Sequence, residues 1–204
     1  MAALPPAWQI QALGRAADAL LAGRDLDAVL VEILEAAREA LPAADKGSIL
    51  FWDEVFQTLH VSHTVGYADP RAPKATFPLT RGYAARCARL RKSLVITDAR
   101  QDAEIRYDGE IEEMRAVRSA VVAPLVTRHR LLGVISLDAG RPSAFVEEDR
   151  RVLGIFACLT ALALDNSRLS RGLDRQVHEL TSALSVANTE PPALPTERGK
   201  LVRP

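Results

Sequence analysis

The chain has 204 residues, 48% hydrophobic and 25% charged, and its 26 basic and 26 acidic residues cancel to a formal net charge of zero. This composition suits a globular protein with a full apolar core, and the lack of a basic excess argues against a non-specific nucleic-acid binder. We find no run of about 20 apolar residues to cross a membrane and no secretory signal in residues 1–10, so we expect a cytoplasmic protein.

The cysteines and histidines do not form a metal-binding pattern. Cys87 and Cys158 are far apart and belong to no CxxC pair, which argues against a disulfide framework and a zinc site. His60 and His63 lie three residues apart, but no cysteine or further histidine is near them. We therefore expect neither a metal nor a cofactor.

Hydrophobic spacing predicts two helices at the N-terminus. Residues 8–22 place Ile10, Leu13, Ala17 and Leu20 on one face, and Gly23 ends this helix. A second helix starts after Asp25, a good N-cap residue, and carries one apolar stripe as far as residue 41. We assign residues 1–24 to a separate N-terminal helix.

The period of the apolar residues then changes to that of strands. The predicted strands are residues 48–52, 58–65, 77–79, 94–97, 119–126 and 131–137. The last two form a hairpin, and Pro124 implies that its strand is bent or lies at an edge. A short helix is predicted for residues 82–90, and the polar segment 99–117 is the longest stretch between strands, a length often linked to function.

A long helix is predicted from Glu147 to about Asn188, followed by a tail, residues 189–204, whose four prolines indicate disorder. The order of the elements predicts an α+β fold. We expect a central antiparallel β-sheet with helices packed on one face and a long C-terminal helix.

Several motifs occur in the order found in a family of signalling domains. They are residues 46–51 (KGSILF), 77–82 (FPLTRG), 94–99 (LVITDA), 117–125 (VRSAVVAPL), 132–137 (LGVISL) and 145–149 (FVEED). With these motifs, residues 25–169 resemble the GAF domain family. The resemblance implies a bacterial signalling sensor, with residues 170–188 as its signalling or coiled-coil helix.

The resemblance also implies where a ligand would bind, although GAF domains share a fold and differ in their ligands. The family's pocket lies between the sheet and the segments that cross it. It maps onto Phe77, Tyr83, Cys87, Asp98, Tyr107, Met114, Arg118 and Ser119. This mixture of aromatic, hydrogen-bonding and cationic groups suits a small organic ligand. We expect Tyr83 and Arg118 to share a cavity beneath residues 99–117, unless Arg118 is fully paired with Asp98 and the residues fill the core.

The residues needed for other GAF chemistries are incomplete. Arg150 stands where the cyclic-nucleotide-binding members carry Glu, and Cys87 is not followed by the His usual beside a bilin-linking cysteine. Cys87 lies beside two arginines and is expected to be solvent-reachable with a favoured thiolate, whereas Cys158 resembles a buried core thiol. The multi-cysteine pattern of the methionine-sulfoxide-reducing type is missing. We therefore predict that the chain is not an enzyme.

The second half of the long helix carries an apolar row suited to a coiled coil. Its members alternate steps of four and three, with one stutter. They are Leu162, Asn166, Leu169, Leu173, Val177, Leu180 and Leu184. Asn166 falls at a core position, where a polar residue can fix the register of a parallel dimer. A single amphipathic helix lying on its own domain is the alternative.

These observations favour a regulatory sensory domain that binds a small molecule or partner. It would transmit a signal through its C-terminal helix to an output domain or protein, acting as a homodimer without nucleic acid or membrane. The alternative is a ligand-free homodimerisation module of a signalling protein. A cavity with convergent polar groups would favour the first, and a fully packed core the second.

Overall fold

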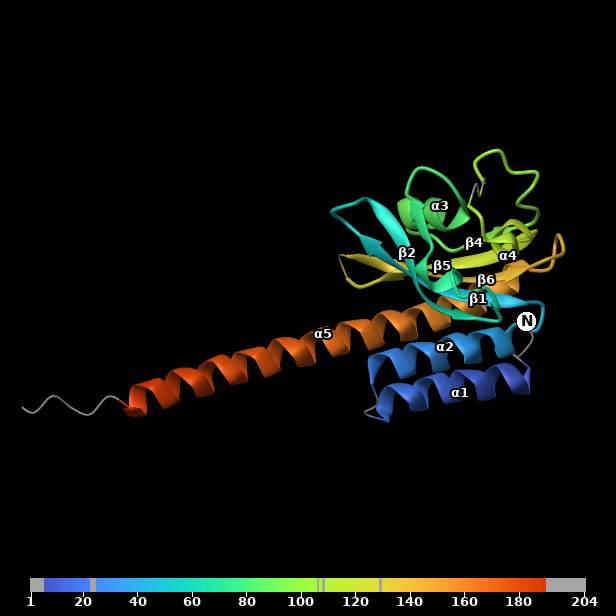
Figure 1. The fold of residues 1–204 in the computed structure, drawn as a ribbon. Helices are drawn as coiled ribbons and strands as arrows, with labels where there is room; N and C mark the ends of the chain where they lie inside the picture. The colour runs from blue at the N-terminus through green and yellow to red at the C-terminus, as the bar shows by residue number, and fades with distance from the viewer. Residues whose placement is uncertain (1–5, 23–24, 106, 108, 129, 190–204) are drawn as a thin grey trace, which may run out of the picture. The chain divides into compact units, whose positions relative to one another are not determined.

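The computed structural model describes residues 6–22, 25–105, 107, 109–128 and 130–189 (Figure 1). Its elements, in chain order, are α1 (Ala7–Leu21), α2 (Leu26–Ala40), β1 (Lys46–Asp53), β2 (Thr58–Val65), η1 (Ala72–Lys74), β3 (Thr76–Pro78), α3 (Tyr83–Leu90), β4 (Leu94–Ile96), α4 (Glu112–Arg115), β5 (Ser119–Val126), β6 (Leu131–Ala139) and α5 (Glu147–Thr189). The predicted helix break at Gly23 and all of the predicted disordered tail except Thr189 lie outside the described residues.

The six strands form one antiparallel sheet in the order β3-β2-β1-β6-β5-β4, which confirms the predicted α+β fold. β5 and β6 pair as the expected hairpin, with Ser119 opposite Ala139. Pro124 pairs with Val134 on one side, while β4 reaches along β5 only to Val122. Pro124 therefore lies where β5 is locally an edge, the position in a sheet that tolerates a missing N–H.

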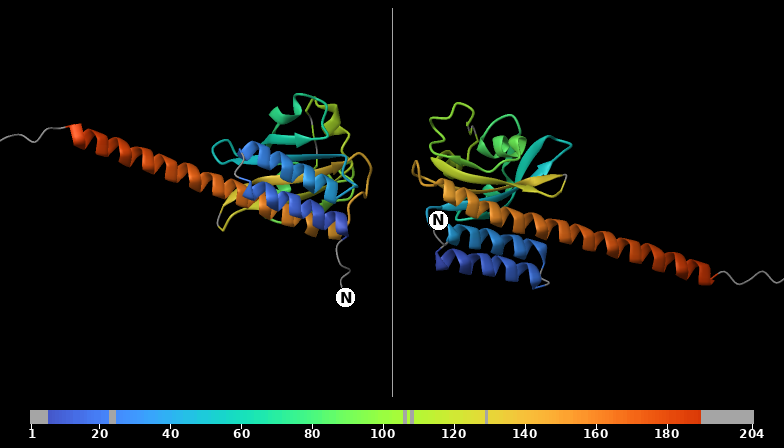
Figure 2. Two further views of the ribbon diagram at one scale, coloured as in Figure 1. Left: turned by 90° about the horizontal axis from the view of Figure 1, so that it is seen from below. Right: turned by 180° about the vertical axis from the view of Figure 1, so that it is seen from behind.

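The sheet has two differently covered faces (Figures 1 and 2). Alternate residues of β1 and β6 point to opposite faces, so that Ile49 and Ile135 belong to a core shared with α1, α2 and the first half of α5. Leu50 and Val134 belong to a second core on the other face, together with α3. The larger, helix-side core anchors the fold, and the opposite face carries the segments that cross the sheet.

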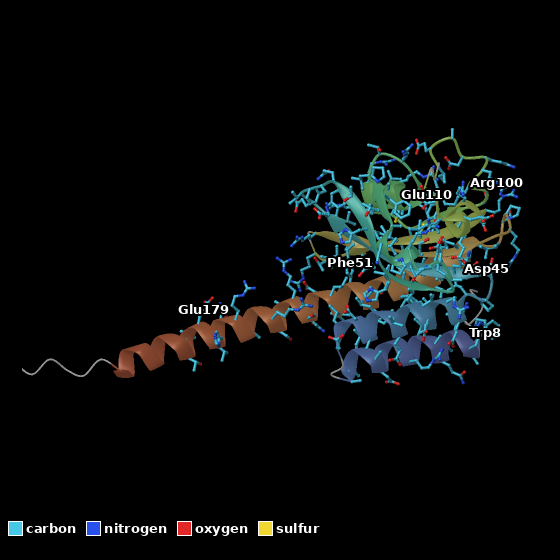
Figure 3. All side chains as sticks on the ribbon, viewed as in Figure 1. Trp8, Asp45, Phe51, Arg100, Glu110 and Glu179 are labelled. Atoms are coloured by element: carbon cyan, nitrogen blue, oxygen red, sulfur yellow. The ribbon has the colours of Figure 1, made fainter. Side chains whose placement is uncertain are left out.

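The predicted face of α1 is right only in part. Leu13 and Leu20 pack against the helix-side core, but the fully buried residues of this helix are Ala12, Ala16 and Ala19. The predicted face member Ile10 is exposed, as is Trp8, which is labelled in Figure 3. Small side chains allow the close packing of α1 on α2, so the alanines, and not the larger side chains, lie at the centre of the contact.

The described chain forms two compact units that divide between Asn166 and Ser167, within α5. In the first unit, Leu153 and Phe156 of α5 are fully buried in the helix-side core. In the second unit, most of the predicted coiled-coil residues have strongly exposed side chains. Leu184 lies in the helix, but its side chain is outside the described residues.

By length and composition alone, α5 is also long and apolar enough over Glu147–Thr181 to cross a membrane. This finding differs from the expectation that no part of the chain is apolar enough to do so. A core helix of a globular domain passes the same test, and Leu153, Phe156 and Ala157 of this helix are buried in the helix-side core.

Candidate functional site

A cavity lies between the second face of the sheet and the segments that cross it. About 60 Å³ of it is open to the centre of a water molecule. Its floor comes from β1, β2 and β6, and its walls from the segments around α3 and α4. The residues that line it are Ser48, Leu50, Val61, Tyr67, Phe77, Arg81, Gly82, Tyr83, Ala84, Ala85, Ile105, Tyr107, Met114 and Ser136.

The floor follows from the alternation of two neighbouring strands. Ser48 lies directly opposite Ser136 in the β1–β6 pairing, and both line the cavity. Asp138, two residues after Ser136, points to the same face of β6. The wall begins at Gly82, the residue before Tyr83, which is the first residue of α3. Gly82 has a φ of 94°. This left-handed backbone favours glycine, and the Gly82 N–H donates to the Glu104 carbonyl over 3.0 Å, which joins the crossing segment to α3.

Asp138 accepts three hydroxyl hydrogen bonds and is only 1% exposed. Ser136 Oγ donates to its Oδ1 over 2.6 Å, Tyr83 Oη donates to Oδ1 over 3.0 Å, and Tyr67 Oη donates to Oδ2 over 3.0 Å. Burial raises the pKa of Asp138, while the three hydroxyls and Lys46 act in the opposite direction. Burial, followed by the charge of Asp138, raises the pKa of both tyrosines, so both hydroxyls keep their protons.

A second polar group holds α4 to the loop after β2. Glu113 accepts the backbone N–H groups of Ala68 and Asp69, over 3.1 and 3.0 Å to Oε2, and these bonds lower its pKa. Lys46 Nζ lies 3.6 Å from Glu113 Oε1 and 5.2 Å from the centre of the Tyr67 ring. Lys46 is thus held by an acid and an aromatic ring at the border of the cavity.

The structure brings four of the eight predicted site residues to the cavity, namely Phe77, Tyr83, Tyr107 and Met114. The rings of Phe77 and Tyr107 have centres 5.7 Å apart and are inclined at 44°, so they form a continuous aromatic wall. Their role in ligand binding stays a prediction.

Arg118 and Asp98 do not line the cavity, so the expectation that Arg118 shares it with Tyr83 is wrong. Arg118 Nε and Nη2 donate to the two carboxylate oxygens of Asp98 over 3.0 and 2.6 Å. This fork-to-fork pair lowers the pKa of Asp98 and raises that of Arg118, mainly through the hydrogen bonds. Ser119 also lies away from the cavity, where its Oγ donates to the Arg141 carbonyl over 2.7 Å.

The two cysteines have the opposite environments to those predicted. Cys87 is fully buried and does not line the cavity, and burial raises the pKa of its thiol to about 12. It shares the packed face of α3 with Ala84 and Ala88, while the neighbouring arginines point away from the core. Cys158 is exposed on α5 although Phe156 and Ala157 are buried, because one residue along a helix turns the side chain by about 100°.

Tyr67, Ser48, Ser136 and Asp138 were not among the predicted site residues. Tyr67 lies in a loop whose path the sequence does not reveal. For β6 a signal was present: Ser136 and Asp138 alternate with Ile135 and Leu137. Polar residues on one face of a strand whose other face is apolar indicate a solvated or functional surface.

The comparisons with known proteins agree on the fold. The model of a family described as "GAF domain" matches residues 23–165. The GAF domain of a phosphoenolpyruvate-protein phosphotransferase from Coxiella burnetii superimposes with a TM-score of 0.70 at 19% identity, covering 80% of this chain and 96% of that one. The corresponding Acinetobacter domain gives 0.69 at 15% identity, covering 82% and 99%. None of the curated proteins matches the chain significantly.

The prediction that the chain is not an enzyme is contradicted by a third similar structure. Free methionine-R-sulfoxide reductase from Neisseria meningitidis, solved with its substrate, has a TM-score of 0.69 at 19% identity, and the match covers 83% of this chain and 96% of that one. The same fold therefore occurs in an enzyme. At this identity the likeness shows the fold alone, so missing family motifs were not a sound basis for excluding an activity.

We predict that Cys158 is alkylated by iodoacetamide well before Cys87 in the folded protein, because Cys158 is exposed and Cys87 is buried with a raised pKa. Timed quenching followed by peptide mass mapping measures both rates. In urea both thiols should react at similar rates, which serves as the control. Equal rates in the folded protein would contradict the assigned faces of α3 and α5.

We also predict that Asp138→Asn changes how stability depends on pH. Because the pKa of Asp138 is raised above 3.8 in the folded protein, the folded state binds this proton more tightly than the unfolded chain. The carboxyl's contribution to the free energy of unfolding therefore falls as the pH rises from 3.8 to the raised pKa. The stability of the unsubstituted protein relative to the variant should fall over that window.

Urea unfolding at intervals from about pH 2 to about pH 8 measures this difference. Asp98→Asn is the matched control with the opposite sign. The pKa of Asp98 is lowered by Arg118, so its contribution is present above 3.8 and is lost as the pH falls towards the lowered pKa. A stability difference for Asp138→Asn that grows with pH would show that the carboxyl is stabilised as an anion.

Proposed function

The chain belongs to the GAF domain family, and on this premise we propose that it is a regulatory sensory domain that binds a small molecule in the cavity over the sheet. One observation carries the proposal. The cavity combines an aromatic wall, formed by Phe77 and Tyr107, with the convergent hydroxyl groups of Ser48, Tyr83 and Ser136. Small-molecule sites are typically apolar pockets with a few placed polar groups.

Strand β6 offers a route from the cavity to the exit helix. Ser136 and Asp138 lie on its cavity face, whereas Ile135 and Leu137 on its other face belong to the same core as Phe156 of α5. A ligand that shifts β6 would therefore disturb the packing of α5. Such coupling requires that the ligand bind more tightly to one arrangement of the helix than to the other.

In this proposal α5 passes the signal to an output domain or a partner protein in the bacterial cytoplasm. The helix is continuous from Glu147 to Thr189 and so extends well past the first compact unit, which divides from the second after Asn166. A continuous helix is a suitable carrier because a change at one end is transmitted through its hydrogen-bonded backbone.

We predict that at least one compound in a screen of nucleotides, amino acids, organic acids and amines raises the melting temperature. A ligand at 100 times its Kd stabilises the folded state by about 2.7 kcal/mol, or roughly 5–10 °C for a chain of this size. Ala84→Leu, which fills the cavity, should abolish the shift, while Arg118→Ala, outside the cavity, should retain it. Loss of the shift in Arg118→Ala alone would move the site to the Asp98 pair.

A ligand-free homodimerisation module is the second candidate, favoured by the exposed row on α5. The exposed fractions are 49% for Leu162, 62% for Leu169, Leu173 and Val177, and 66% for Leu180. Asn166, also exposed, lies at the core position of this row. Isolated apolar side chains at a surface are ordinary, but a row at coiled-coil spacing is typical of a helix with a partner.

We predict that the full-length protein sediments as a dimer at roughly 100 μM, a concentration at which short coiled coils associate. Leu173→Lys combined with Val177→Lys should yield the monomer, because two charges would be buried at the seam. His178→Lys, which adds a charge on the side of the helix away from the row, is the control and should stay dimeric. A monomeric unsubstituted protein would remove the support for the dimerisation module.

A further inference from the structure

Three hydroxyl groups around the cavity already donate their hydrogens to hydrogen bonds within the protein. Tyr67, Tyr83 and Ser136 each carry one O–H, and each donates it to Asp138. A carboxylate offers about four acceptor sites, so it accommodates all three donors, and each hydroxyl oxygen keeps lone pairs after donating. The side of these groups that lines the cavity is therefore rich in acceptors and poor in donors. A molecule bound there gains most if it brings its own donors.

Ser48 adds a buried hydroxyl on the same floor. The residue is only 5% exposed and lies opposite Ser136 across the β1–β6 pair. Ser48 lines the cavity. Its hydroxyl oxygen has lone pairs that can accept a hydrogen bond from a bound molecule.

Aromatic rings surround the same space. The chain has three tyrosines, and Tyr67, Tyr83 and Tyr107 all line this one cavity together with Phe77. The faces of aromatic rings carry partial negative charge and attract cations, and groups of such rings are a known way to hold ammonium compounds. Tyr67 and Tyr83 are also the donors to Asp138, whereas Tyr107 adds a ring face to the cavity wall beside Phe77.

The charges near the cavity favour a cation over an anion. Asp138 lies buried beneath the hydroxyls, and Lys46 is engaged by Glu113 at 3.6 Å. Arg81 also lines the cavity, but it is exposed at the rim and takes part in an interaction of its own, so solvent screens its charge. Asp138 is therefore the acidic group nearest the hydroxyls of the site, and in its ionised form it favours a cation over an anion.

From these contacts we infer that the cavity binds a small organic ammonium ion in preference to a neutral or anionic molecule of the same size. Its N–H groups donate to the oxygens of Tyr67, Tyr83 and Ser136, and its alkyl part lies against Phe77 and Tyr107. Propylammonium is a small member of this class and serves as its test ligand. This inference rests on the proposed function, because it names the ligand class of the same cavity.

Three probes of similar size and different charge test the inference: propylammonium, 1-propanol and propionate. Each is titrated into the full-length ¹⁵N-labelled protein at constant pH and matched ionic strength. Amide shifts near Ser48, Tyr83 and Ser136 report binding at the cavity. We expect propylammonium to bind at least fivefold more tightly than propanol, and propionate to bind more weakly than either. Equal or tighter binding of propanol or propionate would overturn the inference.

Paired variants test the aromatic contribution. Tyr107→Phe keeps a ring face and should leave the propylammonium affinity within twofold, whereas Tyr107→Leu should weaken it at least threefold. The spectrum of each variant without ligand shows whether the fold is retained. Equal affinities in the two variants would contradict the role of the ring in binding a cation.

The outcomes separate this inference from the proposed function. If all three probes bind equally at the cavity, the site is a ligand site without charge preference, so the proposed function stands and the inference fails. If propylammonium does not shift the cavity amides even at high concentration, the inference is wrong, and the broad thermal screen then decides the proposed function on its own.

Discussion

The buried carboxylate of Asp138 is the interaction on which the arrangement of the site depends. An unpaired buried charge is costly, and the three donors that satisfy this one come from the loop after β2, the first residue of α3 and β6 itself. Because these donors are far apart in sequence, their shared acceptor holds the crossing segments at a defined height above the sheet. The cavity is the space left beneath them.

The two faces of the sheet carry different cores because alternate residues of the same strands point to opposite faces. On the helix side, Ile135 and Leu137 contribute to a large continuous core with α1, α2 and α5. On the other side, the second core is smaller and is completed by α3 and the crossing segments. Stability is concentrated where packing is dense, which leaves the opposite face free to hold polar groups and an incompletely filled space.

Much of the fold was predictable because its elements have strong periods. The apolar stripe of α2, the β5–β6 hairpin and the ordered motifs each constrain the chain locally and agree with one another. The prediction of which helix residues are buried and which are exposed was less reliable. Ile10, Cys87 and Cys158 were assigned to the wrong sides of their helices, since a shift of one residue turns a side chain by about 100°.

Only half of the predicted site residues line the cavity, because the position of the others depends on contacts between residues far apart in the sequence. The family resemblance placed Phe77, Tyr83, Tyr107 and Met114 near a pocket, and the structure brings them together there. Whether Arg118 met a ligand or Asp98 depended on a separation of a few ångströms that no local pattern encodes. Tyr67 reaches Asp138 across 71 positions of sequence, a contact invisible to periodicity.

The close approach of β1 and β6 at Gly133 extends the constraint on the cavity to a residue that does not touch it. A Cβ at this position would come within 1.9 Å of the Leu50 carbonyl oxygen. The obstacle is backbone, so no change of rotamer could relieve it, and any other side chain would force the strands apart. Leu50 lies on the cavity floor. The shape of the cavity therefore depends partly on the lack of a side chain at Gly133 on the neighbouring strand. Selection acting on the cavity would also preserve that glycine.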